Sequence, residues 1–342
     1  MNTVSSTVGR GTAPQAAGPP LPFPPKKILV PLDLSARSLQ ALRFARGLAR
    51  QFGSALHLVH ITEPLAYPTD LGYAPVISGE LETELQEGSR ERLAAVVEET
   101  RQGGFTVEGT LRVGRPHSEI VATASELGAD LLVLTTHGFT GLKHVLLGSV
   151  AERVVRHAPC PAWVVRDQET PGGTPPATPE AARTAAGAAE PFRLQRLVVA
   201  TDFSDDSRTA LDYAAALARP YQASLLLVHV TELPYVEANL ADVDTRAFEE
   251  GARQHAEEQL ARWTETQRAA GTQVESRLLT GAAWHEIVIL ARETGAELVV
   301  AGTHGYTGLK HALLGSTAER LVRHAPCPVL VVREKAPAGA PA

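Results

Sequence analysis

The chain has 342 residues, of which 44% are hydrophobic and 20% charged, and its formal net charge is −6. This composition is typical of globular proteins, and the negative charge leaves no basic footprint for nucleic acid. No run of about 18 apolar residues could span a membrane, and the first residues lack the apolar core of a secretory signal, so we expect a cytoplasmic location. Two cysteines without a Cys-x-x-Cys motif exclude a disulfide framework.

Two segments rich in Ala, Pro, Gly and Thr show no apolar periodicity. They cover residues 1–25 and 168–192. Such segments bury too little surface to offset the entropy of ordering, so we expect a disordered tail and a linker. With a short disordered tail at 336–342, the chain divides into two blocks, residues 26–167 and 193–335.

The two blocks repeat each other. Residues 27–35 match residues 196–204 at an offset of 169, and residues 136–149 match residues 303–316 at an offset of 167. The second match extends into an Arg-His-Ala-Pro-Cys-Pro segment in each block. A repeat of this length indicates a duplicated domain, because solenoid units are only about 20–50 residues long.

Apolar, β-branched runs alternate with amphipathic stretches in each block. In the first block the pattern predicts helices between Ser35 as N-cap and Gly53, and over 79–101, 117–127 and 149–157. Such alternation predicts an α/β fold: an open parallel sheet with helices on both faces. The expected strands are 27–32, 55–61, 105–113, 130–135 and 161–166 in the first block, and 196–201, 224–230, 273–280, 297–302 and 328–333 in the second.

The last strand of each block has no helix after it. Residues 162–165 and 329–332 would therefore each form an exposed sheet edge, whose unpaired N–H and C=O groups can pair with another strand. Pairing the two edges with each other removes both of them. We therefore predict an intramolecular pseudo-dimer along these strands, which a linker of about 25 residues is long enough to allow.

Ligands of open parallel sheets bind beyond the carboxyl ends of the strands. In each block an aspartate, Asp33 or Asp202, follows the first expected strand. It could accept a hydrogen bond from a ribose or a base, or it could support the cap of the next helix. A histidine, His60 or His229, lies near the end of the second strand, where packing or polar capping is favoured over catalysis.

A glycine loop follows the fourth expected strand. In the second block it contains Gly302 and Gly305, and Gly315-Ser316 then opens a helix. Glycine lets the backbone approach a phosphate, and a helix N-terminus favours an anion. Because the loop, the helix start and the strand-end aspartate recur together in both blocks, phosphate binding is favoured over an ordinary turn.

These motifs resemble the universal stress protein family. They are Asp-x-Ser after the first strand, Leu-Val-His on the second, Gly-x-x-Gly-x9-Gly-Ser after the fourth, and Cys-Pro before the last. The resemblance covers both blocks. It implies sheets of strand order 3-2-1-4-5 and, in one branch of the family, ATP or a related adenine nucleotide at the rim. It thus implies a regulatory, nucleotide-binding stress-response protein; the alternative is the family's non-binding branch, which acts as interaction or scaffold proteins.

The resemblance also implies which residues contact the nucleotide. In the second block these are Ala200, Asp202, Val230, Gly302, Thr303, His304, Gly305, Tyr306, Thr307, Gly308, Gly315, Ser316, Thr317 and Ala318. In the first block they are Pro31, Asp33, Ile61, Thr135, Thr136, His137, Gly138, Phe139, Thr140, Gly141, Gly148, Ser149, Val150 and Ala151.

The two blocks differ at the first glycine of the loop. Thr135 occupies the position that Gly302 holds in the second block. We expect a side chain there to crowd the nucleotide or to be incompatible with a positive φ, so that the second block binds more tightly. Conversely, Ala200 replaces the motif's proline, which Pro31 retains, and a backbone contact should tolerate that change.

Signals for catalysis are weak. The chain has no Gly-x4-Gly-Lys-Ser/Thr motif and no convincing nucleophile–base pair, so we do not expect an enzyme. Slow ATP hydrolysis, or autophosphorylation at Ser149 or Ser316, is the most that the resemblance implies. An adenylating enzyme would need a Ser-Gly-Gly-x-Asp-Ser loop, which does not follow the first strand.

Metal and thiol chemistry are not expected either. The histidines form no metal-binding motif, so the expected metal is a Mg²⁺ that accompanies the nucleotide rather than a dedicated site. Cys160 and Cys327 are expected to be small buried residues in equivalent turns. The expected partner is an adenine nucleotide, with neither nucleic acid nor membrane, and a further homodimer remains open.

Overall fold

The computed structural model describes residues 23–63, 79–136, 148–165, 194–232, 246–303 and 314–333. Its first half comprises β1 (Lys27–Pro31), α1 (Ala36–Phe52), β2 (Ala55–Thr62), α2 (Gly79–Gln102), β3 (Val107–Val113), α3 (Pro116–Leu127), β4 (Leu131–Thr135), α4 (Ser149–His157) and β5 (Ala162–Val165). The second half comprises β6 (Arg196–Ala200), α6 (Asp205–Tyr221), β7 (Ser224–Thr231), α7 (Arg246–Ala269), β8 (Val274–Thr280), α8 (Ala283–Glu293), β9 (Leu298–Gly302), α9 (Ser316–His324) and β10 (Val329–Val332).

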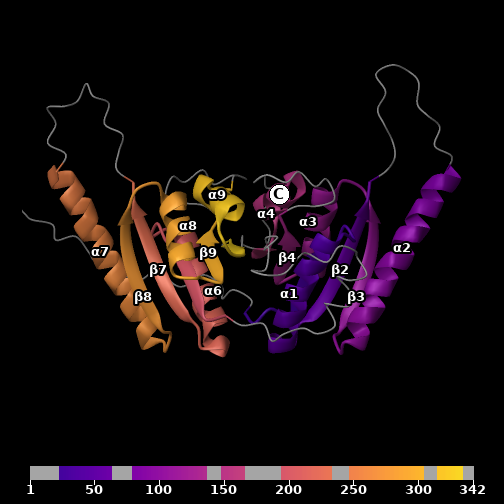
Figure 1. Ribbon diagram of the computed structural model, residues 1–342, viewed down its shortest axis with the longest axis horizontal. Helices are drawn as coiled ribbons and strands as arrows, with labels where there is room; N and C mark the ends of the chain where they lie inside the picture. The colour runs from indigo at the N-terminus through magenta and orange to yellow at the C-terminus, as the bar shows by residue number, and fades with distance from the viewer. Residues whose placement is uncertain are drawn as a thin grey trace, which may run out of the picture.

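One sheet of ten strands runs through the molecule, in the order β3-β2-β1-β4-β5-β10-β9-β6-β7-β8 (Figure 1). Each half contributes five parallel strands in the predicted order 3-2-1-4-5. The strands β5 and β10 pair antiparallel at the centre, where Trp163 lies opposite Leu330. The predicted pairing of the two exposed edges is confirmed, and β3 and β8 are the edges of the combined sheet.

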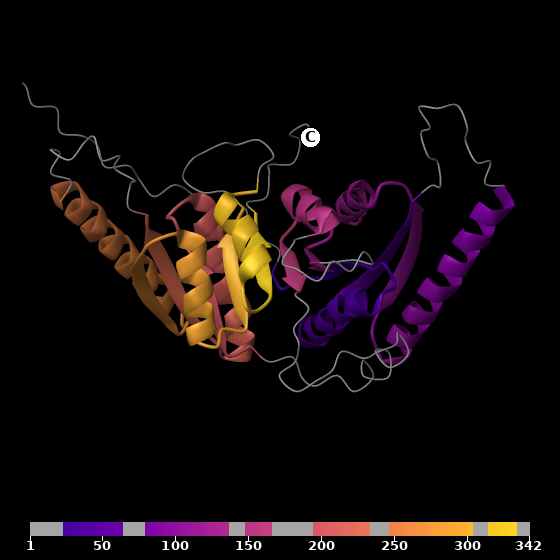
Figure 2. The same cartoon turned by 45° about the horizontal axis from the view of Figure 1, so that its top comes forward.

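Helices cover both faces of the sheet. Side chains of α1, α2, α6 and α7 form one buried apolar layer, and side chains of α3, α4, α8 and α9 form the other. Figure 2 shows the two halves side by side, with α9 of the second half (yellow) and α4 of the first half on the sides where the halves meet. Because the strands alternate their side chains between two covered faces, the central strands β1, β4, β5, β6, β9 and β10 consist mainly of buried apolar residues, whereas the edge strands β3 and β8 also carry polar ones.

The helix ends follow the predicted capping signals. The Ser35 side chain accepts a hydrogen bond from the Ser38 N–H at 3.2 Å, and Gly53 ends α1 with a φ of 67°. In the second half Ser204 caps α6 in the same way, and Gln222 adopts the left-handed conformation at its end. No helix within the described ranges is long and apolar enough to cross a membrane.

Polar contacts join the two halves next to the central strands. Arg323 on α9 lies 4.0 Å from Glu152 on α4, which also pairs with Arg156 at 2.9 Å. Arg333, directly after β10, donates a hydrogen bond to the main-chain oxygen of Arg156. Helix α4 of the first half is therefore held near both of its ends by arginines of the second half.

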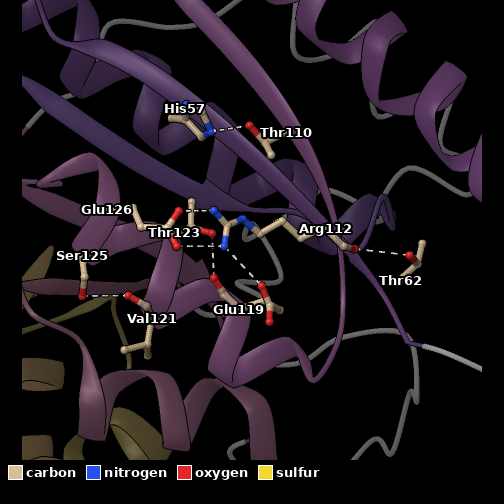
Figure 3. Close-up of polar contacts among 9 residues, drawn as sticks. All are labelled: His57, Thr62, Thr110, Arg112, Glu119, Val121, Thr123, Ser125 and Glu126. Carbon is tan, nitrogen blue, oxygen red and sulfur yellow. Dashed lines mark hydrogen bonds and ion pairs between the residues drawn. The ribbon is translucent and has the colours of Figure 1, made fainter. Parts of the chain in front are cut away.

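Arg112 ties the edge strand β3 to α3 in the first half (Figure 3). Its guanidinium lies 3.3 Å from Glu119 and donates to both carboxylate oxygens of Glu126. These bonds raise the pKa of Arg112, with Glu126 as the main cause. The second half has Leu279 at the equivalent position, so this network belongs to the first half alone.

Candidate functional site

Among the described residues predicted to contact a ligand, those at the ends of the strands lie at one rim of the sheet in each half. Strand β1 lies between β2 and β4, and β6 lies between β7 and β9, all parallel. Their carboxyl ends therefore meet at the same edge. This places Pro31, Ile61 and Thr135 on one rim and Ala200, Val230 and Gly302 on the other.

A tight turn leads from the first strand of each half into the following helix. Oδ1 of Asp33 accepts a hydrogen bond from the Ser35 N–H at 2.9 Å, and Oδ1 of Asp202 accepts from the Ser204 N–H at 3.0 Å. The aspartates thus support the cap, one of the two roles considered for them. Oδ2 of Asp33 is buried and has no hydrogen-bond partner among the described residues.

The residue after each aspartate has a strained backbone. Leu34 has a φ of 62° and Phe203 a φ of 67°. Bulky side chains seldom adopt this left-handed conformation, and such strain is concentrated at functional sites. Its occurrence at the same place in both halves marks this turn as a conserved feature of the duplicated unit rather than a local irregularity.

The histidines of β2 and β7 support the rim instead of facing a ligand. His60 is buried, and its Nδ1 lies 2.7 Å from the main-chain oxygen of Leu32. The Nδ1 of His229 lies 2.8 Å from the oxygen of Thr201, and its ring lies against Phe203 with centroids 4.4 Å apart. The expected packing and capping role is confirmed.

The glycine loop of each half is closed at its ends by a backbone hydrogen bond. The Gly148 N–H donates to the Thr136 oxygen at 2.8 Å, and the Gly315 N–H donates to the Thr303 oxygen at 2.8 Å. Thr136 and Thr303 also bond through their N–H groups to Val165 and Val332, respectively. The loops between these anchors, including His137, Gly138, Phe139, Thr140, Gly141, His304, Gly305, Tyr306, Thr307 and Gly308, lie outside the described residues.

The helices that follow the loops start at the rim. Gly148 and Gly315 are the N-caps of α4 and α9, and neither helix has a side-chain cap. The first helical hydrogen bond of α9 runs from the Glu319 N–H to the Gly315 oxygen at 3.0 Å. The N–H groups of Ser316, Thr317 and Ala318 come before this bond and have no partner within the helix. The N–H groups of Ser149, Val150 and Ala151 occupy the same positions in α4. The start of each helix therefore presents N–H donors and the positive end of the helix dipole, which favour an anion.

The structure excludes one of the two predicted reasons for glycine at position 302. Gly302 lies in extended β9 and does not have a positive φ, so that reason is wrong, and crowding of a nucleotide by a side chain stays a prediction. A Cβ at this position would instead come within 3.0 Å of the backbone and Cβ of Asp206, in the first turn of α6. The glycine allows the close approach of α6 to β9, and Oδ2 of Asp206 accepts a hydrogen bond from the Thr303 hydroxyl at 2.9 Å.

Analysis of the sequence missed Asp206. Its equivalent in the first half is Arg37. The two halves therefore differ in charge at this position, and they also differ at the end of the fourth strand, where Gly302 is equivalent to Thr135. A comparison of the two copies at this position, one residue before the shared serine of the first helical turn, could have shown the difference. The two rims thus differ at neighbouring positions on the first helix and the fourth strand of each half: Asp206 and Gly302 in the second half, and Arg37 and Thr135 in the first.

The remaining predictions concern thiols and metals. Cys160 and Cys327 are buried free cysteines, as expected for small packing residues. Within the described part of the chain, no group of three or more His, Cys, Asp or Glu side chains could hold a metal ion.

The fold and the rim define a class of protein: a tandem, doubly wound α/β protein with one strand-end site in each half. The model of the universal stress protein family matches residues 24–166 and 193–333. The chain therefore belongs to the universal stress protein family.

Similar proteins support this assignment. Universal stress protein MJ0531 of Methanocaldococcus jannaschii is 37% identical over 142 residues, which are 41% of this chain and 82% of that protein. Universal stress protein YxiE of Bacillus subtilis is 34% identical over 152 residues, 40% of this chain and 98% of that protein. Each of these relatives thus aligns with less than half of this chain.

Solved structures match this chain across both halves. The crystal structure of a universal stress protein from Archaeoglobus fulgidus covers 91% of this chain and 99% of its own, with a TM-score of 0.65 and 22% identity. At this identity the likeness supports the shared fold.

Proposed function

We propose that this chain is a regulatory stress-response protein that binds an adenine nucleotide, ATP, at the strand-end rims. The observation that carries the proposal is the start of α9 at the rim. Gly315 provides no side-chain cap, and the helix begins beside a loop whose ends are closed by the bond from Gly315 to Thr303. By contrast, α1 and α6 are capped by their own serines.

The residues present fit such a ligand. The N–H groups of Ser316, Thr317 and Ala318 would hold phosphate oxygens, with the positive end of the helix dipole behind them. The strand-end aspartate would accept hydrogen bonds from the ribose or base, and the buried Oδ2 of Asp33 is an acceptor that needs such a donor. A Mg²⁺ ion would arrive with the phosphates and neutralise part of their charge.

The second half is proposed to bind more tightly. Gly302 brings β9 against α6, and the Asp206–Thr303 bond fixes the start of the loop there. In the first half, Thr135 and Arg37 occupy the equivalent positions. These differences favour a mainly structural role for the first half. The first half alone would then resemble the non-binding members of the family, which act as interaction or scaffold proteins.

The test is calorimetric titration of ATP into the full chain and its Asp202→Asn and Asp33→Asn variants. Asparagine keeps the Oδ1 acceptor that supports the turn and changes only the second oxygen. We expect Asp202→Asn to weaken the tighter site by roughly tenfold, as for loss of one hydrogen bond to a charged group. We expect Asp33→Asn to leave that site unchanged. The proposal would be wrong if the purified protein carries no nucleotide and millimolar ATP produces no binding heat.

A further inference from the structure

A cavity of about 510 Å³ lies between the start of α6 and the middle of α7 in the second half. Its walls include Phe203 and Arg208 from the α6 side, and His255, Gln259, Arg262 and Trp263 from α7. Helices α6 and α7 cover the face of the sheet opposite to α8 and α9 (Figure 1). The cavity therefore lies on the face of the sheet opposite to α8 and α9, and its volume suits a small organic ligand.

Duplication supplies an internal comparison for this cavity. The first half carries Leu39, Gly88, Ala95 and Val96 where the second carries Arg208, His255, Arg262 and Trp263. Leu39 and Val96 are buried in the apolar core of the first half. The same fold is therefore built in the first half with other residues at these four positions.

Arg208 on α6 stacks on the indole ring of Trp263 from α7. The guanidinium carbon of Arg208 lies 4.4 Å from the ring centre of Trp263, which is 3% exposed. Phe203 packs edge to face on the same indole with centroids 5.6 Å apart. A guanidinium that stacks on a ring directs its N–H donors outward in the plane of the group. Arg208 is therefore positioned to bind an anion through two parallel hydrogen bonds, in bidentate geometry.

The side chains of α7 add further donors along one side of that helix. His255, Gln259 and Arg262 recur at spacings of four and three residues, which places them on one face. Among the described residues, no hydrogen bond or ion pair engages the side chains of His255 or Arg262. The one carboxylate in the wall, Asp202, already accepts hydrogen bonds from the N–H and hydroxyl of Ser204.

We propose that this cavity binds a small organic anion that consists of a planar ring bearing a carboxylate or a phosphate. Arg208 and Arg262 receive the anionic group, because both are cations with planar donor sets. Phe203 and the edge of the Trp263 indole contact the planar ring of the ligand. The site is separate from the nucleotide rim and shares only Asp202 with it.

The experiment follows the indole N–H signal of Trp263 in ¹H–¹⁵N spectra of the full chain, assigned with Trp263→Phe. Nε1 of Trp263 is buried and has no partner among the described residues, so its signal reports directly on this wall. The probes are benzoate, phenyl phosphate, inorganic phosphate and benzyl alcohol, each titrated alone. We expect saturable shifts with benzoate or phenyl phosphate, and the stronger of the two identifies the anionic group. Inorganic phosphate should bind more weakly and benzyl alcohol should leave the signal unchanged.

Variants that restore the first-half residues sharpen the test. Arg208→Leu and Arg262→Ala should each weaken binding of the ring-bearing anion at least tenfold, while urea unfolding confirms that the chain is folded. Arg253→Ala is the matched control, because Arg253 is an exposed arginine of α7 that pairs with Glu257 at 3.0 Å outside the cavity. The proposal is overturned if no anion shifts the indole signal, if the Arg208→Leu, Arg262→Ala double variant retains the shift, or if only the Gly315 amide at the rim responds.

Discussion

The ring of Phe23 packs edge to face against the ring of Tyr213, with centroids 5.3 Å apart. Phe23 precedes the first strand of the first half, and Tyr213 lies on α6 of the second half. The same phenyl ring packs on Phe52 of α1 at 5.2 Å. A residue within the range expected to be a tail thus joins helices of both halves, and the packed part of the chain begins before residue 26.

Phe23→Ala should lower the free energy of unfolding by about 2 kcal/mol, because it removes two ring contacts and part of an apolar side chain. The measurement is urea unfolding of the full chain, followed by far-ultraviolet circular dichroism. Phe23→Leu retains apolar volume without the ring and should lose roughly half as much. Equal stability of Phe23→Ala and the unmodified chain would show that this contact does not join the halves.

Arg112→Ala should destabilise the first half by about 1 kcal/mol, since it leaves Glu119 and Glu126 without their shared cation on the edge strand. The loss should shrink in concentrated salt, because these side chains are partly exposed. Urea unfolding at low and high sodium chloride measures both effects. Arg101→Ala, which breaks an exposed pair with Glu98, is the control and should change stability less.

The protein should lose stability as the pH falls below about 6.5, the ordinary pKa of histidine. Burial lowers the pKa of His229, against the opposing effects of its bond to Thr201 and of Asp202. Burial is also the main cause that lowers the pKa values of His57 and His157. In this pH range the unfolded chain binds more protons than the native one, so acid favours unfolding.

The His229→Gln variant tests this pH dependence. Its urea midpoint should change less between pH 7.5 and pH 5.5 than that of the unmodified chain, because a partly buried histidine with a lowered pKa has been removed. A steeper dependence in His229→Gln would contradict the assignment of native His229 as the neutral form.

Gly302→Thr, which copies the first half into the second, should lower stability by about 1–3 kcal/mol. The added Cβ would meet Asp206 at 3.0 Å, so α6 and β9 must separate. Urea unfolding measures the loss, and calorimetric titration measures any accompanying loss of ATP affinity. Thr135→Gly is the matched variant, and a larger loss of stability there than in Gly302→Thr would contradict the proposed packing role of the glycine.

The sequence predicted most of the fold because its signals are local. Ser35 and Gly53 mark the ends of α1 through capping chemistry that acts within four residues. The strand order and the β5–β10 pairing were also predictable, the first from the family resemblance and the second from the exposed edges that 162–165 and 329–332 would leave. At the rim, the packing role of His60 and the position of the Gly-Ser helix starts followed from the motifs.

Other features depend on residues that are distant in the sequence. The role of Gly302 required the position of Asp206, which is 96 residues earlier in the chain. The cavity beside Arg208 could be found only once the side chains of α7 were placed. The helical periodicity is the same in α2 and α7, although Ala95 of α2 stands where α7 has Arg262. Periodicity identifies the buried side of each helix, but it does not specify which neighbour will lie against it.

The sequence by itself therefore determined the duplication, the α/β class and the approximate bounds of the predicted elements, since each follows from short-range patterns or from repetition. Only the tertiary structure decided that Phe23 joins the halves, that α6 requires a glycine at position 302, and that Arg208 stacks on Trp263 in one half alone. These are contacts between surfaces of separate elements, and close packing makes each depend on the shape of both partners at once.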